Sequence, residues 1–220
     1  MTLGEQQGYW APGDLVGDPM AGAGVSLSAF RVRGYDVVGI ERRREVYELL
    51  VANAARQDAL RFGEYGKCVL YHADCRNVVL DAQWDACFTQ PPYRAKSFSD
   101  RGEESDEELV ELMHSGLWTA IASVFRMVYA ALKPGGVFVT VTRNRSYLLR
   151  LVDVAANTQY LAIRAGFAPL RVHAGEQPNR IRTSGLLKRP LEGFNDGLFL
   201  ERGRLDLVID GEDILFFRKE

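Results

Sequence analysis

The stretch DLVGDPMAGAGVSLSAF, residues 14–30, decides the fold class of this 220-residue chain. It begins with an apolar run that predicts a short β-strand, Asp14–Asp18. A turn of small residues follows at positions 19–24, and Val25–Arg33 then has the apolar periodicity of a helix. A strand that passes through a small-residue turn into a helix is typical of an α/β domain.

The same alternation continues along the chain. Further strands are predicted at Asp36–Glu41, Cys68–Ala73, Trp84–Thr89, Val137–Thr142, Ala168–His173 and Ile214–Arg218, and helices at Arg42–Phe62, Glu107–Leu132 and Leu148–Ala165. Strands separated by helices imply right-handed crossovers, and therefore a parallel sheet with helices on both faces. Because the sequence has no internal repeat and no low-complexity linker, we expect one α/β domain over residues 1–220.

Polar side chains lie at the ends of four consecutive predicted strands: Asp18, Glu41, Asp74 and Gln90. Ligands of open parallel sheets bind beyond the carboxyl ends of the strands, so these residues predict a site there. Gly22 and Gly24 in the first turn would let a ligand lie against bare backbone at a helix N-terminus. The turn lacks the third glycine of G-x-G-x-x-G and has no Walker lysine, which argues against a pyrophosphate ligand.

The acidic residues indicate what the ligand is. An acid at Asp18 favours a cationic ligand, Glu41 is placed to accept hydrogen bonds from ribose hydroxyls, and Asp74 could accept from an adenine amino group. Together they describe a nucleoside with a positively charged tail and no phosphate, which is the chemistry of S-adenosyl-L-methionine. Each feature alone also fits a plain turn, a solvated acid or a helix cap, but their combination on three successive units favours a ligand.

A second motif, Gln90-Pro91-Pro92-Tyr93, follows the fourth strand directly. The two prolines have fixed φ and no N–H, so they form a stiff turn with free carbonyl groups. The turn presents an amide, carbonyl acceptors and an aromatic ring, which suits a planar group that bears an exocyclic amino group. Taken alone, the motif is also consistent with a proline stop after a buried strand, with Tyr93 packed in the interior.

These motifs resemble those of the S-adenosylmethionine-dependent amino-methyltransferases that act on nucleic-acid bases, chiefly DNA adenine-N6 and cytosine-N4 methyltransferases. Residues 18–24, DPMAGAG, resemble the family's D-P-F-x-G-x-G cofactor motif. Residues 88–93, FTQPPY, resemble its [D/N/S]-P-P-[Y/F/W] catalytic motif. Gly39–Glu41 is similar to the ribose-binding strand of the family, and Ala73-Asp74 to its adenine-facing acid.

The resemblance covers about residues 14–142 and includes LKPGG at 132–136, a segment widespread in methyltransferases. It implies a Rossmann-like methyltransferase fold, with a mostly parallel seven-stranded sheet, helices on both faces and an antiparallel C-terminal strand. The cofactor half would span about residues 1–85, and the catalytic and substrate-facing half about residues 86–220. The residues expected to bind S-adenosyl-L-methionine are Asp18, Pro19, Met20, Ala21, Gly22, Gly24, Glu41 and Asp74.

The resemblance also implies a reaction, the direct transfer of a methyl group to an exocyclic amino nitrogen of a DNA base that has left the duplex stack. Gln90 Oε1 and the Pro91 carbonyl would accept the amino protons, and Tyr93 would stack on the base, so the catalytic residues are Gln90, Pro91, Pro92 and Tyr93. The family has Asp, Asn or Ser where this chain has Gln90, whose side chain is one methylene longer than that of Asn. Two alternatives stay open: an RNA base methyltransferase and a non-catalytic S-adenosylmethionine-binding subunit.

The charge distribution is consistent with a nucleic-acid partner, with DNA as the expected polymer. Residues 143–204 carry ten arginines and one lysine against five acidic residues, although the net charge of the chain is −2. The predicted phosphate contacts lie in the loop after the catalytic turn and in a long basic connection at 174–204; they are Arg94, Lys96, Arg180, Arg182 and Lys188. A general preference for arginine over lysine and a mobile surface loop are the alternative explanations.

Other classes of protein are disfavoured. The sequence has no apolar run of membrane-spanning length and no signal-peptide pattern at its start, so we expect a cytoplasmic protein with no membrane partner. Three cysteines without C-x-x-C spacing and three dispersed histidines predict neither a disulfide framework nor a metal site. A homodimer or a separate recognition subunit stays open.

Overall fold

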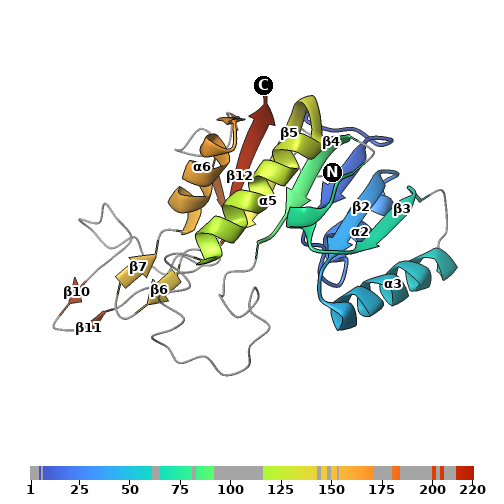
Figure 1. Ribbon diagram of the computed structural model, residues 1–220, viewed down its shortest axis with the longest axis horizontal. Helices are drawn as coiled ribbons and strands as arrows, with labels where there is room; N and C mark the ends of the chain where they lie inside the picture. Colours follow the sequence, from blue (N-terminus) through green and yellow to red (C-terminus); the bar gives the residue numbers. More distant parts are fainter. Residues whose placement is uncertain are drawn as a thin grey trace.

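The computed structural model describes residues 5, 7–60, 65–80, 83–91, 116–142, 145–147, 150–152, 154–170, 180–183, 200–201, 204–205 and 212–220. Figure 1 shows a sheet with helices packed against it. The helices are α2 (Val25–Arg31), α3 (Arg44–Ala59), the 3-10 turn η1 (Cys75–Asn77), α5 (Trp118–Ala131) and α6 (Val154–Arg164). The strands are β1 (Leu15–Asp18), β2 (Asp36–Glu41), β3 (Cys68–His72), β4 (Trp84–Thr89), β5 (Leu132–Thr142), β6 (Arg145–Tyr147), β7 (Arg150–Val152), β8 (Phe167–Pro169), β9 (Arg180–Thr183), β10 (Leu200–Glu201), β11 (Arg204–Leu205) and β12 (Glu212–Lys219).

The main sheet has the strand order β3-β2-β1-β4-β5-β12-β8 (Figure 1). The first five strands in this order are parallel to one another, whereas β12 runs antiparallel to β5 and β8. The outer edge of β12 is shared, because its end pairs with β8 and its beginning pairs with β9. The sheet therefore has seven positions, and the predicted mostly parallel sheet with an antiparallel C-terminal strand is confirmed.

The hydrophobic core forms two layers, one on each face of the sheet. Neighbouring residues of a strand alternate between them: Val37 belongs to one layer and Val38 to the other, and Phe216 and Phe217 divide in the same way. The layer that contains Val38 is covered by α5 and α6, which lie in front of the sheet in Figure 1. The opposite layer is covered by α2 and α3 and by the segment that carries Trp10.

The predicted helix Leu148–Ala165 is wrong in its first part. The chain there forms a hairpin in which β6 pairs antiparallel with β7, and α6 begins only at Val154. The apolar residues of 148–152 fit a helical period as well as a strand, so tertiary pairing decides between them. Strand β5 begins at Leu132 rather than at Val137. Its pairing with β4 shifts register between Trp84 and Ala86 of β4, and the extra residues of β5 form a bulge in which Gly135 adopts a φ of 80°.

Two further segments are compared with the sequence expectation. The described helix α5 begins at Trp118, and residues 107–115 of the predicted helix lie outside the described residues. The basic connection at 174–204 contains strands β9 and β10 where we expected a loop. Across the described part of the chain, no helix is both long enough and apolar enough to cross a membrane.

Candidate functional site

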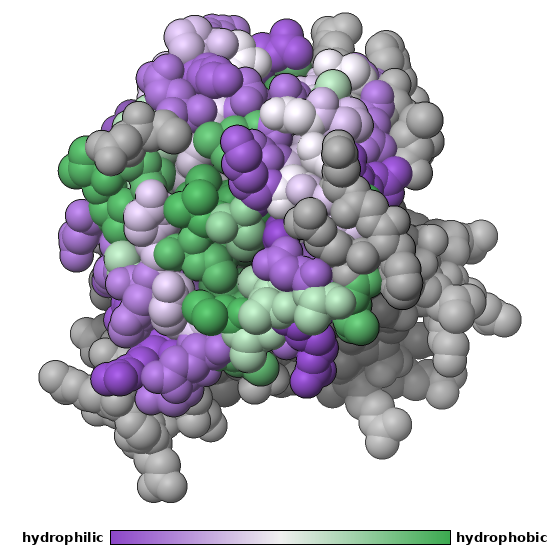
Figure 2. All heavy atoms as spheres, turned by 90° about the vertical axis from the view of Figure 1, so that its right-hand side faces the viewer, coloured by the Kyte–Doolittle hydropathy of each residue, from purple (hydrophilic) through white to green (hydrophobic). Residues whose placement is uncertain are grey.

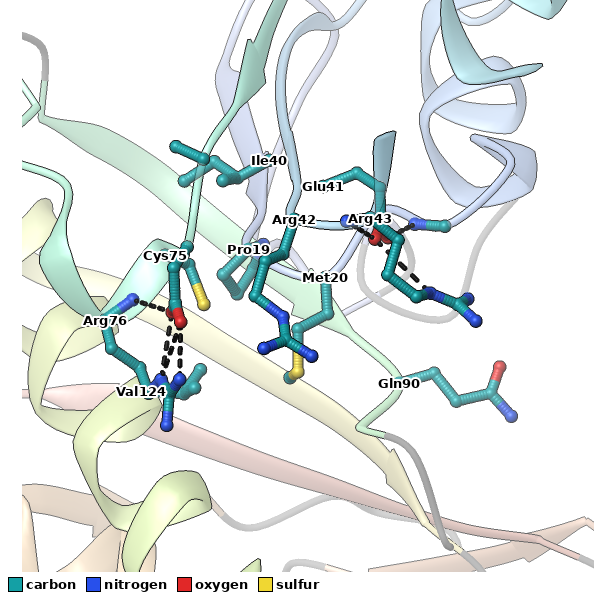
Figure 3. A pocket seen from close by; sticks show the side chains of 13 residues that line it. Pro19, Met20, Ile40, Glu41, Arg42, Arg43, Cys75, Arg76, Gln90 and Val124 are labelled. Carbon is teal, nitrogen blue, oxygen red and sulfur yellow. Dashed lines mark hydrogen bonds and ion pairs between the residues drawn. The ribbon is translucent and has the colours of Figure 1, made fainter. Parts of the chain in front are cut away.

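A cavity of about 240 Å³ opens where β1, β2, β3 and β4 end (Figure 3). Its walls come from the turns after these four strands and from one side chain of α5. The lining residues are Pro19, Met20, Gly22, Ile40, Glu41, Arg42, Arg43, Ala73, Asp74, Cys75, Arg76, Gln90 and Val124. Six of the residues predicted from the sequence therefore lie around one cavity: Pro19, Met20, Gly22, Glu41, Asp74 and Gln90.

Asp18 lies behind this cavity rather than in its wall. Its carboxylate is buried and accepts hydrogen bonds from the Met20 backbone N–H at 3.1 Å, from the Thr89 hydroxyl at 2.9 Å and from the Ser26 hydroxyl. Burial raises the pKa of this carboxyl, and the three hydrogen bonds act in the opposite direction. In this structure the Asp18 carboxylate bonds to the glycine turn (residues 19–24) and is not among the lining residues, and its contact with the cofactor stays a prediction.

The glycine turn itself divides into an exposed part and a supporting part. Gly22 has a φ of 54°, and a Cβ there would meet no other atom within 4 Å, so its backbone is open to the cavity. Gly24, at a φ of 88°, faces inward, and a Cβ at this position would collide with Leu50. Ala21 is buried, and its N–H donates to the Ile40 carbonyl at 3.0 Å. Of these three residues, only Gly22 lines the cavity, and Ala21 and Gly24 shape the turn.

Glu41 ends β2 with a buried, well-oriented carboxylate. Its Oε2 accepts a hydrogen bond from the Gly22 N–H at 3.2 Å, and its Oε1 accepts from the Arg43 N–H at 2.7 Å. The Arg43 guanidinium lies 3.7 Å from the same Oε1. These contacts hold the carboxylate beside the glycine turn, where its remaining lone pairs can accept from a ligand diol.

Asp74 follows β3 and caps the short helix η1. Its Oδ1 accepts from the Arg76 N–H at 3.0 Å, and the Arg76 guanidinium forms an ion pair with the carboxylate, with Nε 2.9 Å from Oδ1. The hydrogen bond from Arg76 is the main cause that lowers the pKa of Asp74. Asp74 therefore stays an acceptor in mildly acidic solution, which is the state that recognises an amino group.

Cys75 forms part of the cavity wall, and its environment disfavours the reactive thiolate form. Its side chain is buried, and this burial raises the pKa of the thiol to about 12. A thiol with that pKa is uncharged at neutral pH, and the thiolate is the reactive form. The packing interpretation of the cysteines from the sequence is consistent with this environment.

Gln90 lies at the end of β4 and lines the cavity with an exposed side chain. Figure 3 shows it on the opposite side of the pocket from Arg76, with Met20 between them. Pro91 follows and is buried. The other members of the predicted catalytic motif and the loop after it, Pro92, Tyr93, Arg94 and Lys96, lie outside the described residues.

Three arginines of the site were not predicted from the sequence. Arg42, Arg43 and Arg76 all line the cavity, and Figure 3 shows them on the turns after β2 and β3. Two of them stand two residues after a strand-end acid, in Glu41-Arg42-Arg43 and Asp74-Cys75-Arg76. That repeated acid-x-Arg spacing was the available signal. No sequence pattern indicated Val124, because the packing of α5 against the sheet brings it to the cavity.

Of the predicted phosphate-contacting residues, the structure describes Arg180 and Arg182, both in strand β9. Arg182 is aligned with Asp213 of β12, which in turn pairs with Thr142 at the end of β5. Arg180 stands two positions earlier in β9 and is aligned with Leu215. Lys188 lies outside the described residues. Among the residues that are described, no group of three His, Cys, Asp or Glu side chains could hold a metal ion.

Several solved structures share this architecture. An S-adenosylmethionine-dependent methyltransferase from Methanosarcina mazei is 13% identical, with a TM-score of 0.59 over 98% of this chain and 96% of its own. The magnesium protoporphyrin IX methyltransferase of Synechocystis PCC 6803, solved with bound S-adenosylhomocysteine, is 12% identical, with a TM-score of 0.57 over 99% of this chain and 78% of its own. A methyltransferase from Pyrococcus furiosus is 12% identical, with a TM-score of 0.55 over 100% of this chain and 83% of its own.

These similarities establish the fold of the chain, which is the Rossmann-like methyltransferase fold. At such low identities they say nothing of the reaction, since one fold supports many functions. No protein-family model matches the sequence, and no curated protein matches it either.

Proposed function

We propose that this chain is an S-adenosyl-L-methionine-dependent methyltransferase that methylates an exocyclic amino nitrogen of a base in DNA, at adenine N6 or cytosine N4. The observation that carries the proposal is the arrangement of Glu41, Asp74, Gly22 and Gln90 around one cavity at the carboxyl edge of a methyltransferase-fold sheet. The proposed reaction rests on the Gln90-Pro91-Pro92-Tyr93 motif, which resembles that of the DNA amino-methyltransferases.

The chemistry of the cavity suits the proposed cofactor. Glu41 offers carboxylate oxygens to a ribose diol, Asp74 offers an ionised acceptor to an adenine amino group, and the side chain of Met20 offers a polarisable surface to a purine ring. The open backbone at Gly22 leaves room for the tail of the ligand. S-adenosylmethionine supplies an electrophilic methyl group on a sulfonium.

Gln90 would hold the target amino group. Its Oε1 and the Pro91 carbonyl would accept hydrogen bonds from the two amino N–H groups, which directs the nitrogen lone pair toward the methyl group. Transfer breaks the bond from sulfur to the methyl group, so S-adenosylhomocysteine leaves and one amino proton is released to solvent. The catalytic contribution is orientation and electrostatic stabilisation, with no covalent enzyme intermediate. By resemblance Tyr93 would stack on the base, which must leave the duplex to reach the cavity.

One observation favours a second candidate, a non-catalytic subunit that binds S-adenosylmethionine. Gln90 stands where the amino-methyltransferases have Asp, Asn or Ser, and its exposed amide lies one methylene further from the turn than an Asn amide would. The presence of Gln90 in place of Asp, Asn or Ser changes none of the residues proposed for cofactor binding. Binding without transfer is the behaviour that this candidate predicts.

The test supplies labelled S-adenosylmethionine to the purified protein with duplex DNA, single-stranded DNA or total RNA, followed by digestion and identification of the modified nucleoside. N6-methyladenine or N4-methylcytosine from DNA is the expected product. The same nucleosides from RNA alone would replace DNA by RNA as the substrate. Calorimetric binding of the cofactor without any transfer would favour the non-catalytic subunit, and absence of binding would overturn both proposals.

Gln90→Asn separates the enzyme from the subunit. An enzyme hampered by the longer side chain gains activity when the amide is brought back to the usual length, whereas a scaffold gains none. Gln83→Asn is the matched control, because Gln83 is an exposed glutamine just before the amino end of the same strand, β4. Cofactor affinity should be the same in both variants.

Arg94, Lys96, Arg180, Arg182 and Lys188 are the proposed contacts to the DNA backbone. Replacement of both Arg180 and Arg182 by glutamine should weaken binding to all DNA sequences about equally, because contacts to phosphate do not distinguish between bases. The dependence of log affinity on log salt should also become shallower, by about 0.9 for each phosphate that the variant no longer neutralises. Cofactor binding should not change.

A further inference from the structure

Strand β3 forms an open edge of the sheet. Among the described residues, it pairs with β2 and with no other strand. Natural sheets protect such edges with charged side chains, proline or bulges. The sequence of β3, CVLYH, has no proline and no Lys, Arg, Asp or Glu, and its register with β2 is regular over all five residues. This edge therefore lacks the usual protection.

Two side chains of this strand are exposed although they are apolar. The parallel register aligns Val69 with Val38 and Tyr71 with Ile40, so all four lie on the face of the sheet that α5 covers. Val38 and Ile40 are buried, whereas Val69 is 44% exposed and Tyr71 is 40% exposed. The described part of the connection from β3 to β4 contains only the short η1, so no α-helix there covers β3 on this face.

The surface view agrees with this description. Figure 2 shows the side of the molecule on which β3 and α3 lie, where hydrophobic residues are exposed among hydrophilic ones. Val79, in the connection after β3, is 92% exposed. Apolar surface of this kind, gathered at one edge, is typical of an interaction site.

The backbone of β3 also has groups available for pairing. The Val37 N–H donates to the Lys67 carbonyl, and the Ala73 N–H donates to the Glu41 carbonyl. In a parallel ladder alternate residues bond to the same neighbour, so the odd-numbered residues of β3 bond to β2. The N–H and C=O groups of Cys68, Leu70 and His72 therefore point outward. One of them, the Leu70 carbonyl, is approached by the Tyr47 hydroxyl at 3.5 Å, and a carbonyl can accept a second bond.

We propose that β3 pairs with β3 of a second copy of this chain, antiparallel and about a two-fold axis at Leu70. This register makes the outward-pointing residues, Leu70 with its own copy and Cys68 with His72, the hydrogen-bonded pairs. Val69 then lies opposite Tyr71 of the second copy in a close, non-hydrogen-bonded pair. Such a β-branched and aromatic pair is a favourable cross-strand contact.

A second copy fits this edge because the strand is self-complementary. A two-fold axis at Leu70 brings the outward-pointing N–H and C=O groups of the two strands together as hydrogen-bonded pairs. It also places Val69 of each copy opposite Tyr71 of the other. Standard interfaces bury roughly 1,200–2,000 Å², and a pair of five-residue strands is a smaller contact, so we expect a weak dimer that dissociates on dilution. The paired strands run in opposite directions, so the two cavities face opposite ways and each is complete in its own chain. The proposal is independent of the proposed methyltransferase function.

The test is a charge exchange across the proposed pair, read by sedimentation equilibrium. The unaltered chain should form a concentration-dependent dimer. The variants V69K/Y71K and V69E/Y71E place like charges opposite each other and should each be monomeric. Their equimolar mixture should form a heterodimer, because every introduced lysine of one chain then faces an introduced glutamate of the other.

Circular dichroism establishes that each variant is folded, which is expected because both side chains are exposed. Tyr160→Lys is the matched control: Tyr160 is 60% exposed on α6, next to the opposite end of the sheet, and its replacement should leave the dimer intact. An unaltered chain that stays monomeric, or a dimer that survives in V69K/Y71K, would overturn the proposal. So would a mixture that remains monomeric.

Discussion

The hydroxyl of Thr89 donates a hydrogen bond of 2.9 Å to Oδ1 of Asp18, between residues 71 positions apart in the sequence. The same oxygen accepts from the Met20 N–H in the glycine turn. Thr89 directly precedes Gln90, so one buried carboxylate joins the turn proposed to hold the cofactor to the turn proposed to hold the substrate. This contact adds to the direct pairing of β1 with β4, which already places the two turns side by side.

Thr89→Val should therefore affect both stability and transfer. Valine keeps the shape of threonine but removes the donor, and a buried carboxylate that loses a partner destabilises the fold by about 1–3 kcal/mol. Thr89→Ser, which restores the hydroxyl, should recover most of that loss. Urea unfolding measures the change. In the proposed reaction the methyl-transfer rate should fall more than the cofactor affinity, and an equal fall in both would mean that Thr89 has only a structural role.

The pH dependence of stability should show the burial of Asp18. Burial raises its native pKa above the ordinary value of 3.8, so the native state binds this proton more tightly than the unfolded chain does. Its contribution to stability therefore falls as the pH rises from about 3.8 through the native pKa. Asp18→Asn does not titrate.

The difference in unfolding free energy, Asp18→Asn minus the unaltered chain, should accordingly increase with pH over that window and level off above the native pKa. Urea unfolding at a series of pH values measures it, and the other titrating groups cancel in the subtraction. A difference that stays constant, or that decreases with rising pH, would contradict a raised pKa.

Two glycines of the cofactor turn should respond differently to alanine. Both have positive φ, which costs an alanine about 1–2 kcal/mol. At Gly24 the new methyl would also collide with Leu50, so Gly24→Ala should destabilise the chain by more than that. At Gly22 the methyl enters open space above the cavity, so Gly22→Ala should lose mainly cofactor affinity. Urea unfolding and calorimetric titration with S-adenosylmethionine, run on both variants, separate the two effects. Equal stability losses would contradict the assignment.

The strands at the centre of the sheet could be predicted because local and tertiary preferences agree there. Asp36–Glu41 and Trp84–Thr89 have the predicted bounds, since a short apolar run between turn signals has few alternatives. The antiparallel strand β12 followed from the resemblance. The segment 148–152 could not be assigned in the same way, because its apolar residues suit a helix and a hairpin equally well.

The site was predictable to the extent that it depends on strand ends. Parallel strands end at or just before Glu41, Asp74 and Gln90, so the topology brings these three residues to the same edge of the sheet. The position of Asp18 behind the turn depends on the side chains of Ser26 and Thr89, which no local pattern reveals. For the same reason Val124 could not be found, because α5 brings it to the cavity by packing alone.

The ion pair between Arg76 and Asp74 should extend cofactor binding to lower pH. The hydrogen bond from Arg76 lowers the pKa of Asp74, so the carboxylate remains an acceptor in solutions where an unpaired aspartate takes up a proton. Arg76→Gln removes the positive charge, and the pKa of Asp74 should then rise. Because the proposed contact with an adenine amino group needs the ionised carboxylate, the affinity for S-adenosylmethionine should begin to fall at a higher pH in the variant than in the unaltered chain.

Calorimetric titrations between neutral and mildly acidic pH measure this shift, with circular dichroism to establish that the variant stays folded. Arg126→Gln is the matched control, because Arg126 donates to the Ser123 hydroxyl on α5 and does not line the candidate cavity. Asp74→Asn should bind weakly at every pH and lose the acid dependence of this group. If Arg76→Gln and Arg126→Gln weaken at the same pH as the unaltered chain, Asp74 does not contact the cofactor as proposed, and Arg76 serves only to hold Asp74 in its position as the cap of η1.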